Sequence, residues 1–535
     1  MAGKKFQSEA FFLFLFLLPY IAVFCNSLPL STSSRWIVDQ ATGKRVKLAC
    51  VNWVSHLQPM IAEGLDKKPL KYIAGKVSSM GFNCVRFTWA TYMFTRANYS
   101  KITVSQSLDN FGLKDAKAGI ARNNPQVLCL SVVDLHKAVV NELGKNNIMV
   151  VLDNHVSQPK WCCSDNDGNG FFGDVNFDPK EWLQGLSIVA RTYKDNPTVV
   201  AMSMRNELRG ALQSKDDWRL YMEEGATTIH RENPNVLIIV SGLNFDTNLE
   251  FLKTKPFRVN FNDKLVFEAH WYAFSIPREK WIAQSNNICA YITRNAKNNY
   301  LFLIRGNNPF PLFLSEFGID QRGVNEADNR YISCLLATAA EYDIDWALWA
   351  LQGSYILREG KANHDEVYGL LDINWDDANN SSFLEKLQLI KQINQDVVPN
   401  HPTYYLLYHP LSGQCVKFCK TVYLTNCKTA SRFDQHQDGG PIKLAGPSQC
   451  LGVVGEGVGA RASNDCSSKW RSVSSSKLHL AAPSGPGKFL CLEKNDADST
   501  IVTKKCLCMG DNLQNAPSCP QNPEIQWFKL VPVNV

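Results

Sequence analysis

Two glutamates, Glu207 and Glu316, each stand within a few residues of the end of a short apolar run of the sequence. A pair of carboxyl groups on opposite sides of a bond can divide the work of cleaving it, because one donates a proton while the other attacks or directs water. Glycosidic bonds are hydrolysed in this way. Either glutamate alone would be an ordinary exposed or ion-paired residue at a strand end, so the hypothesis depends on the residues around the pair.

Other polar and aromatic residues follow further apolar runs in the same manner. In a barrel of parallel strands, the carboxyl ends of all strands meet at one rim, and catalytic groups lie there. Residues that recur at this one position are therefore expected to face a common site. Besides the two glutamates, these residues are Trp53, Arg86, His155, Asn206, His270, Tyr272 and Trp349.

The elements that must position these residues alternate regularly between residues 36 and 400. Short apolar runs rich in β-forming residues alternate with longer amphipathic stretches, a pattern typical of a parallel sheet with crossover helices. Eight strands predict an α/β protein with a (β/α)8 TIM barrel. The predicted strands are Val46–Val51, Cys84–Phe87, Ile148–Asp153, Val199–Met204, Leu237–Ser241, Leu265–Glu268, Pro311–Ser315 and Asp345–Leu348.

One crossover helix can be read in detail. Ser131 and Asp134 have the spacing of a capping box, and an apolar stripe from Val132 to Leu143 follows at helical intervals. Gly144 then predicts the end of the helix. The next five residues are continuously apolar, as expected of a strand buried on both faces.

This ordered set resembles the active site of glycoside hydrolase family five, and the resemblance covers the whole barrel region. It implies a retaining mechanism in which Glu207 is the general acid/base and Glu316 the nucleophile, with carboxyls roughly 5–5.5 Å apart. It further implies that Arg86 keeps Glu316 ionised and that Asn206 binds the sugar 2-hydroxyl. The other implied roles are a hydrogen bond to the nucleophile (Tyr272), proximity to the acid/base (His270), contact with the sugar at the cleavage point (His155) and a stacking platform (Trp349).

Four more tryptophans lie in segments expected on the same face. Large aromatic side chains line sugar-binding clefts, but they also fill barrel cores and the bases of loops. Both interpretations stay open for each of them, and Trp53 and Trp161 are the two predicted to support substrate binding. The four are Trp53, Trp89, Trp161 and Trp271.

A polar insertion, residues 161–170, follows the third predicted strand and is expected to wall the site. Its Asp165-x-Asp167-x-Asn169-Gly170 run imitates the start of a calcium loop, but position twelve is Asn176 where such a loop has Glu. An Asx/Gly turn therefore fits better. We expect no metal and no cofactor.

Composition and charge exclude several classes of protein. The chain has 535 residues, 45% hydrophobic and 20% charged, which fits neither disorder nor a collagenous or coiled-coil chain. With 56 Lys+Arg against 50 Asp+Glu, its charge gives no support to a nucleic-acid or acidic-membrane partner. The expected partner is a polysaccharide or oligosaccharide substrate.

The first 27 residues have the features of a secretory signal peptide. Lys4 and Lys5 precede an apolar run from Phe11 to Phe24 that ends at small or short residues. A membrane anchor is the alternative, but this run is shorter than the ~20 residues that span a bilayer. We therefore expect a secreted, extracellular protein, at the cell wall or in the extracellular matrix, with no membrane contact after signal removal.

Cysteine usage fits an oxidising compartment. Sixteen of the 17 cysteines follow the predicted signal peptide, seven between Cys50 and Cys334 and nine between Cys415 and Cys519. Zinc is the alternative for the clustered tail cysteines, but they lack paired C-x-x-C spacing. Because both groups are odd in number, either one bridge joins the two regions or each region keeps an unpaired thiol.

The tail also repeats a short pattern. Gln414-Cys415-Val416, Gln449-Cys450-Leu451 and Leu490-Cys491-Leu492 recur at intervals of about 40 residues, which predicts a closed β structure of three units. The pattern resembles the ricin B-type β-trefoil lectin domain. Neither Trp470 nor Trp527 has the Gln two residues before it that this family shows, so a second glycan contact through the tail stays open.

Together these features predict three parts: a signal peptide over residues 1–27, a catalytic barrel domain over 28–400 and a trefoil-like all-β domain over 401–535. The hypothesis is a secreted retaining endo-glycosidase acting on a β-1,4-glucan or β-mannan. A carbohydrate-binding or wall-associated protein with weak turnover, and a transglycosylase with the same catalytic residues, are the alternatives. Asn98, Asn379 and Asn380 begin glycosylation sequons and are expected in exposed loops.

Overall fold

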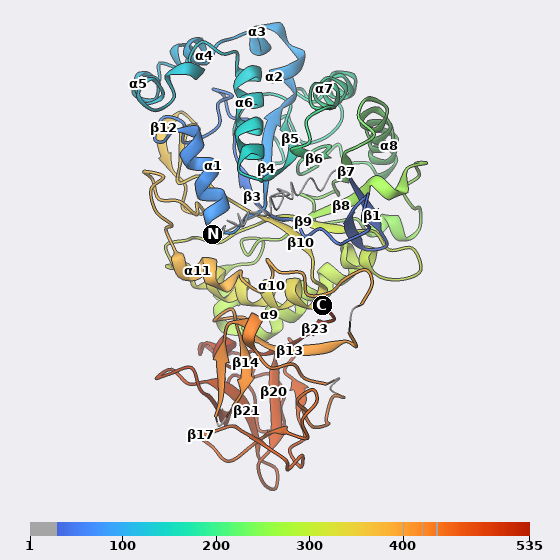
Figure 1. Cartoon of the computed structure of the whole chain (residues 1–535), viewed down its shortest axis with the longest axis vertical. Helices are drawn as coiled ribbons and strands as arrows, with labels where there is room; N and C mark the ends of the chain where they lie inside the picture. Colours follow the sequence, from blue (N-terminus) through green and yellow to red (C-terminus); the bar gives the residue numbers. More distant parts are fainter. Residues whose placement is uncertain (1–28, 400, 420, 435–436) are drawn as a thin grey trace, which may run out of the picture.

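Eight parallel strands form a closed barrel in the computed structural model, which describes residues 29–399, 401–419, 421–434 and 437–535 (Figure 1). The predicted signal peptide, residues 1–27, lies outside the described residues. The barrel strands are β3 (Ala49–Trp53), β4 (Cys84–Ala90), β5 (Met149–Val156), β6 (Val199–Ser203), β7 (Leu237–Val240), β8 (Leu265–His270), β9 (Leu312–Phe317) and β10 (Asp345–Leu348).

The eight strands confirm the predicted TIM barrel. Each strand pairs in parallel with its sequence neighbour, and β10 closes the ring on β3. Several strands run further than predicted at their carboxyl ends: β5, for example, continues through Asn154 and His155. The strands continue through these polar residues. Their side chains are buried and hydrogen-bonded inside the barrel mouth, so they need no solvent there.

Helices surround the barrel (Figure 1). The predicted capped helix is α6, and the Ser131 Oγ accepts a hydrogen bond from the backbone N–H of Asp134 at 3.0 Å. Between β7 and β8, residues 241–264 contain only the 3-10 turns Glu250–Lys253 and Asn262–Lys264, so the alternation is complete in strands but not in helices. The helices are α1 (Leu70–Ser79), α2 (Thr91–Thr95), α3 (Ala97–Ser100), α4 (Val104–Asn110), α5 (Lys114–Asn123), α6 (Val132–Lys145), α7 (Pro179–Thr192), α8 (Lys215–Glu232), α9 (Arg278–Asn299), α10 (Glu326–Tyr342) and α11 (Ser381–Lys386). Among the described residues, none of the helices combines the length and apolarity needed to cross a membrane.

Two hairpins lie at opposite ends of the barrel. The first pairs β1 (Leu30–Ser33) with β2 (Trp36–Asp39) and packs Leu30 and Ile37 into the apolar cluster at the amino ends of the strands. The second pairs β11 (Ser354–Arg358) with β12 (Lys361–Asp365), directly after β10. Closing one end with apolar side chains leaves the other end, where the strands' polar residues lie, for chemistry.

All-β sheets follow the barrel and pack below α9 and α10 in Figure 1. They comprise a four-stranded sheet in the order β15-β14-β13-β23, a pair β16-β18, and a five-stranded sheet β17-β22-β21-β20-β19. We call this region, from Tyr404 to the end of the chain, the tail domain. Its strands are β13 (Tyr404–His409), β14 (Gln414–Phe418), β15 (Val422–Thr425), β16 (Cys450–Gly452), β17 (Val458–Gly459), β18 (Arg461–Ser463), β19 (Arg471–Val473), β20 (His479–Pro483), β21 (Phe489–Lys494), β22 (Ile501–Lys505) and β23 (Lys529–Val533).

The tail domain is attached to the barrel by apolar packing and by hydrogen bonds. Tyr408, Trp527 and Val531 join the main apolar core of the barrel. The Trp527 indole N–H donates to Asn286 Oδ1 on α9 at 3.0 Å, and Ser333 Oγ on α10 donates to Glu524 Oε2 at 2.8 Å. Buried contacts of both kinds hold two domains in a fixed relation.

Disulfides settle the cysteine alternatives. No bridge among the described residues joins the two domains; Cys129 in the barrel domain and Cys419 in the tail domain are the unpaired cysteines there. Eight of the nine tail cysteines are bonded in disulfides, and the single remaining thiol, Cys419, cannot by itself make a zinc site. The bridges are Cys50–Cys84, Cys162–Cys163, Cys289–Cys334, Cys415–Cys427, Cys450–Cys466, Cys491–Cys506 and Cys508–Cys519.

The sequons differ in their surroundings. Asn98 is exposed on α3. The Asn379 side-chain amide donates to the carbonyls of Gly369 and Leu371, and Asn380 caps α11. Asn98 is therefore the sequon best placed to carry a glycan, which stays a prediction.

Candidate active site

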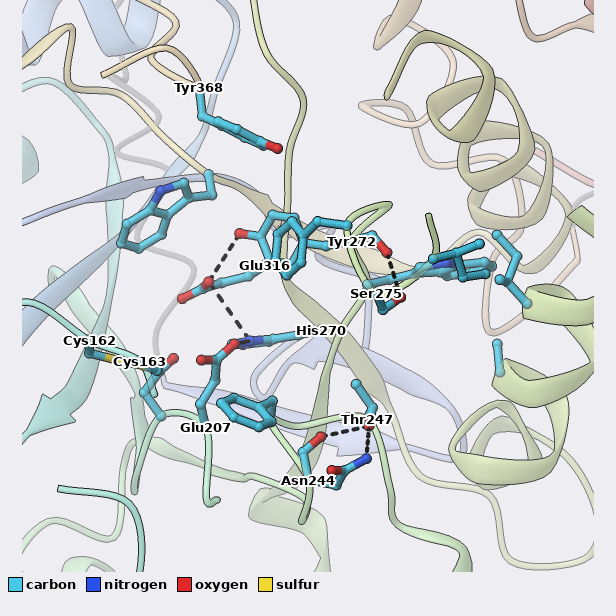
Figure 2. A pocket seen from close by; sticks show the side chains of 18 of the residues that line it. Cys162, Cys163, Glu207, Asn244, Thr247, His270, Tyr272, Ser275, Glu316 and Tyr368 are labelled. Atoms are coloured by element: carbon cyan, nitrogen blue, oxygen red, sulfur yellow. Dashed lines mark hydrogen bonds and ion pairs between the residues drawn. A yellow bond between two sulfur atoms is a disulfide. The ribbon is translucent and has the colours of Figure 1, made fainter. Parts of the chain in front are cut away.

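One cavity of about 890 Å³ opens where the barrel strands end (Figure 2). Residues at or after the ends of β5 to β10 line this cavity, because the parallel register brings these carboxyl ends to one rim. Arg86, from β4, lies beneath the cavity floor and is fully buried. The predicted site residues that line the cavity are His155, Trp161, Asn206, Glu207, His270, Tyr272, Glu316 and Trp349.

Glu207 and Glu316 face each other across this cavity, from the ends of the fourth and seventh barrel strands. One carboxylate oxygen of Glu207 lies within 4.8 Å of one oxygen of Glu316. His270 lies between them, with Nδ1 2.9 Å from Glu207 Oε1 and 3.8 Å from Glu316 Oε2. The Tyr272 hydroxyl donates to Glu316 Oε2 at 3.1 Å.

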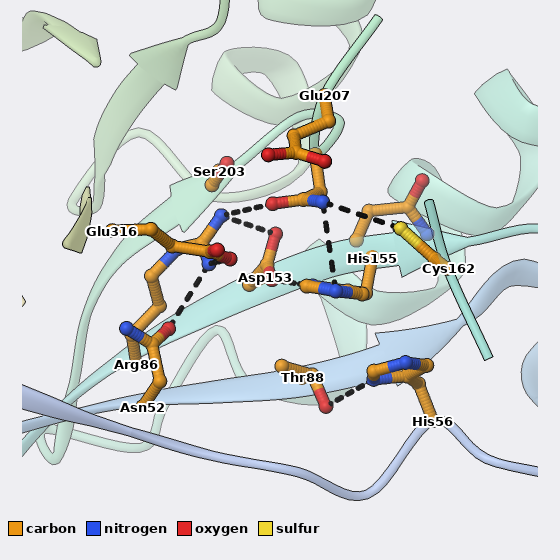
Figure 3. Close-up of polar contacts among 12 residues, drawn as sticks. Asn52, His56, Arg86, Thr88, Asp153, His155, Cys162, Ser203, Glu207 and Glu316 are labelled. Atoms are coloured by element: carbon orange, nitrogen blue, oxygen red, sulfur yellow. Dashed lines mark hydrogen bonds and ion pairs between the residues drawn. The ribbon is translucent and has the colours of Figure 1, made fainter. Parts of the chain in front are cut away.

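Arg86 connects the floor of the site, as Figure 3 shows. Its guanidinium donates to Glu316 Oε1 at 2.8 Å and to Asn206 Oδ1 at 2.9 Å, and pairs with Asp153 at 3.1 Å. It also donates to Asn52 Oδ1 at 3.0 Å. Fixed donors of this kind hold a carboxylate and an amide in one orientation.

Both glutamates have shifted pKa values. Burial raises the pKa of Glu207 to about 7, although Arg209 and Arg86 oppose the shift. Burial likewise raises the pKa of Glu316 to about 7, against the opposite effects of His270 and Arg86. The sequence interpretation considered only the effect of Arg86, which has the expected direction but is outweighed by desolvation. Near neutral pH such a pair can hold one acid and one carboxylate, as a two-carboxyl reaction requires.

Burial lowers the pKa of two histidines in the site, His155 and His270. Burial lowers the pKa of His155 well below its ordinary value, and nearby Arg86 adds to the shift. Burial also lowers the pKa of His270, although Glu316 acts in the opposite direction. The His155 Nδ1 bonds to Asp153 Oδ2 at 2.6 Å, and its ring stacks on Trp349 at 5.6 Å. These contacts fix the orientation of the His155 ring at the cavity wall.

The tryptophans divide between cavity and core. Trp161 and Trp349 line the cavity and meet edge to face, with ring centroids 6.5 Å apart. Trp271 lines it too. Trp53 and Trp89 are completely buried, and the Trp53 indole N–H donates to the carbonyl of Glu63 at 3.0 Å. The prediction that Trp53 supports the substrate is therefore wrong: its side chain packs in the core, away from the cavity.

The polar insertion, residues 161–170, forms the Asx turn that the sequence favoured over a calcium loop. The Asp167 carboxylate accepts from the backbone N–H of Asn169 at 2.8 Å and from Arg209 Nη2 at 2.5 Å. Its oxygens are thus occupied by an Asx turn and an ion pair.

The sequence interpretation missed two buried carboxyls, Asp246 and Glu268, which lie close to Glu207 and Glu316. Asp246 Oδ2 accepts from the backbone N–H of Glu207 at 2.9 Å and lies 3.6 Å from His270 Nε2. Asp246 follows the fifth barrel strand, the one strand end to which no residue was assigned. Glu268 stands two residues before His270 on β8, so both point to the barrel interior, and a charge inside an apolar strand was the available signal.

Within the part of the chain that the structure describes, two clusters have the spacing of metal ligands: His155 with Cys162 and Cys163, and Glu207 with His270 and Glu316. In the first, the sulfurs are bonded to each other, so they are not thiolates. In the second, the guanidinium of Arg86 already pairs with Glu316 and would repel a cation. The donor sets therefore do not fit a resident metal.

A closed parallel barrel whose fourth and seventh strands end in glutamates that face each other across a cavity defines a barrel glycosidase. The model of the cellulase family, glycosyl hydrolase family 5, matches residues 40–354. A glycosyl hydrolase 5 family protein of Chamaecyparis obtusa is 44% identical over 537 residues, covering 97% of this chain and 95% of that protein. The chain belongs to glycosyl hydrolase family 5 and is a glycosidase.

More distant relatives match a smaller share of the chain. An endoglucanase of Paenibacillus polymyxa is 21% identical over 368 residues, covering 64% of this chain and 82% of that enzyme. The solved structure of an endocellulase from Pyrococcus horikoshii superposes with a TM-score of 0.56 at 16% identity, covering 68% of this chain and 99% of that one. The latter similarity supports the fold.

Proposed function

We propose that this protein is a secreted, retaining endo-glycosidase that cleaves a β-1,4-glucan, with Glu207 as acid/base and Glu316 as nucleophile. The observation that carries the proposal is the approach of the two carboxylates to within 4.8 Å. Retaining enzymes hold their carboxyls about 5–5.5 Å apart, whereas inverting enzymes need about 6.5–9.5 Å to admit a water molecule.

The reaction would proceed in two balanced steps. Protonated Glu207 gives its proton to the glycosidic oxygen while the Glu316 carboxylate bonds to the anomeric carbon, and the bond to the leaving sugar breaks. Glu207, now ionised, takes a proton from water as the water oxygen attacks the anomeric carbon, and the bond to Glu316 breaks. Arg86 and Tyr272, which donate to Glu316, would orient it for attack and receive it when it leaves.

The relatives guide the choice of sugar. The Paenibacillus polymyxa protein is described as an endoglucanase and the Pyrococcus horikoshii protein as an endocellulase, which favours a glucan over a mannan. A cavity of about 890 Å³ lined by Trp161 and Trp349 has space for more than one sugar unit. Secretion is supported by the seven disulfides among the described residues, because such bonds persist in oxidising compartments.

We further propose that the tail domain is a ricin B-like β-trefoil. Each of its three Cys strands begins one local disulfide: Cys415–Cys427, Cys450–Cys466 and Cys491–Cys506. Such threefold recurrence is what a trefoil of three units would produce. A second glycan contact through the tail would appear as binding by the full chain that a cleft-filling oligosaccharide does not displace.

The test is hydrolysis by Glu316→Gln on a panel of soluble β-1,4-glucans and β-mannans, with Glu250→Gln, an exposed glutamate, as the matched control. We expect the Glu316 variant to lose activity by at least about 10³-fold and the control to keep it. Nuclear magnetic resonance of the first product formed should find the β anomer. Unimpaired hydrolysis by the Glu316 variant, or an α-anomeric first product, would reject the mechanism.

A further inference from the structure

The bond between the neighbouring residues Cys162 and Cys163 lies in the wall of the active-site cavity. Both cysteines line that cavity together with Trp161 and Trp349. Figure 2 shows the pair on the side of the cavity opposite Tyr272, with Glu207 and Glu316 between them. A disulfide in this wall borders the space that a bound sugar would occupy.

This disulfide contributes little as a cross-link. A bridge stabilises a fold mainly by restricting the unfolded chain, and the effect grows with the length of the loop that it closes. Cys162 and Cys163 are adjacent, whereas the other six bridges span 11 to 45 residues. Loop closure therefore does not explain a bond at this position.

The segment that carries the disulfide is firmly attached to the catalytic residues. Arg209 donates to the carbonyl of Glu207 at 2.6 Å, to the carbonyl of Ser164 at 3.0 Å and to Asp167 at 2.5 Å. The side-chain N–H₂ of Asn206 lies 3.8 Å and 3.6 Å from the two sulfurs. The disulfide is thus held in place against the residue that precedes Glu207.

Chemically, a disulfide offers a compact surface without a charge or an S–H group. Sulfur is polarizable and only a weak hydrogen-bond acceptor, so this surface behaves as apolar. The faces of a β-linked pyranose present C–H groups, which pack on apolar surfaces while the hydroxyls seek polar partners. Asn206 and His155 beside the sulfurs supply such partners.

We infer that the Cys162–Cys163 disulfide is a sugar-contacting surface of the cleft, against which the C–H face of the sugar at the cleavage point packs. The inference rests on the proposed glycan cleavage. It makes the two cysteines determinants of substrate affinity, a role different from that of the other bridges.

The first experiment uses the full chain with Glu316→Gln, which prevents turnover. Calorimetry measures cellotetraose binding, and the protein is then treated with a phosphine reductant, alkylated and mapped by peptide mass spectrometry. Saturating cellotetraose should slow reduction of Cys162–Cys163 at least fivefold and leave the half-exposed Cys508–Cys519 bridge unaffected. Binding without this protection overturns the inference alone, whereas absence of binding to both cellotetraose and mannotetraose overturns the proposed function as well.

The second experiment compares two double variants of the active chain. Cys162→Ala/Cys163→Ala should raise KM for cellotetraose about fivefold, the effect of losing some 40 Å² of apolar contact, with little change in Tm. Cys508→Ala/Cys519→Ala should do the reverse, lowering Tm without changing KM. An unchanged KM in a folded Cys162/Cys163 variant, or peptides of the untreated parent in which these two cysteines are not bonded to each other, would contradict the inference.

Discussion

In both domains, burial raises the pKa of at least one glutamate to about 7. The surroundings of these glutamates differ between the two domains. In the barrel, Glu207 and Glu316 border an open cavity, each beside the other and beside His270. At the edge of the tail domain, Glu524 is completely enclosed, with Ser333 of α10 donating to its carboxylate. A shifted pKa therefore does not by itself mark a catalytic group; access to a cavity and a second carboxyl distinguish the site from the interface.

The barrel domain has tryptophans both at its cavity and in its core, whereas the two tail tryptophans are both in the core. Trp161 and Trp349 border the cavity of the barrel. Trp470 and Trp527 of the tail domain are completely buried, and each donates its indole N–H to a carbonyl or amide oxygen, Leu451 and Asn286 respectively. Any sugar contact by the tail domain would thus use other residues.

Replacing each glutamate with glutamine is the most direct test of the difference between the cavity and the interface. We expect Glu207→Gln to lower kcat/KM on a soluble glucan by about 10³-fold, because the leaving oxygen loses its proton donor. Glu524→Gln should remain within about twofold of the parent, because its carboxyl reaches no substrate. Steady-state kinetics measures both; similar losses in the two variants would mean that the interface glutamate takes part in catalysis.

The second prediction concerns stability against pH. The folded protein holds the Glu524 proton up to about pH 7, while the unfolded chain releases it near the ordinary carboxyl pKa of 4.5. The stabilising contribution is therefore complete below about pH 4.5 and is lost as pH rises through 7, about 3 kcal/mol in all. Glu207 and Glu316 titrate in the same range, so the quantity of interest is the difference between the parent and Glu524→Gln.

Urea unfolding at pH 5 and pH 8 provides that difference. The glutamine variant should lose less stability between the two pH values than the parent does. Equal losses would show that Glu524 is ionised in the folded protein throughout this range.

Asp246 allows a test of whether activity depends on the hydrogen bond that holds the backbone of Glu207. Asp246→Ala removes the acceptor of the Glu207 backbone N–H. Glu207 needs this support because its φ of 44° lies in the left-handed region. Leaving a buried N–H group without its acceptor costs about 1–3 kcal/mol, so kcat/KM should fall by about 10- to 100-fold. Asp246→Asn keeps an oxygen in place and should recover most of the rate; an equal loss in both variants would point to charge as the important property.

The smallest expected effect concerns the two tail tryptophans. Trp527→Phe removes a hydrogen bond to α9, whereas Trp470→Phe removes one within the tail domain. Each should destabilise by about 1 kcal/mol. Calorimetric unfolding should show only the first variant shifting the barrel transition; a barrel Tm that is unchanged by Trp527→Phe would mean that the domains unfold independently.

Much of the fold was accessible from local pattern. The eight apolar runs became eight barrel strands, and Ser131 caps α6 as its spacing predicts. The strand ends were less accurate, because a polar residue such as His155 continues a strand when a buried partner accepts its hydrogen bond. No local pattern reveals such a partner.

The sequence predicted the residues of the site about as well as it predicted the fold. The residues of the cavity rim stand one after another at strand ends, so their common placement follows from the parallel register. Trp53 has the same placement in sequence, yet its side chain turns into the core. Asp246 was overlooked, although the fifth strand end was the position at which to seek it.

The sequence by itself determined the order of the strands, the two glutamates at their ends and the separate cysteine-rich tail, because alternation, strand register and composition are local properties. Only the tertiary structure decided which tryptophans meet the cavity, which cysteines pair, and that burial outweighs Arg86 at Glu316. These outcomes depend on how far each group is removed from water and on which distant segments surround it. Desolvation and long-range contact are properties of the packed molecule, and no window of sequence contains them.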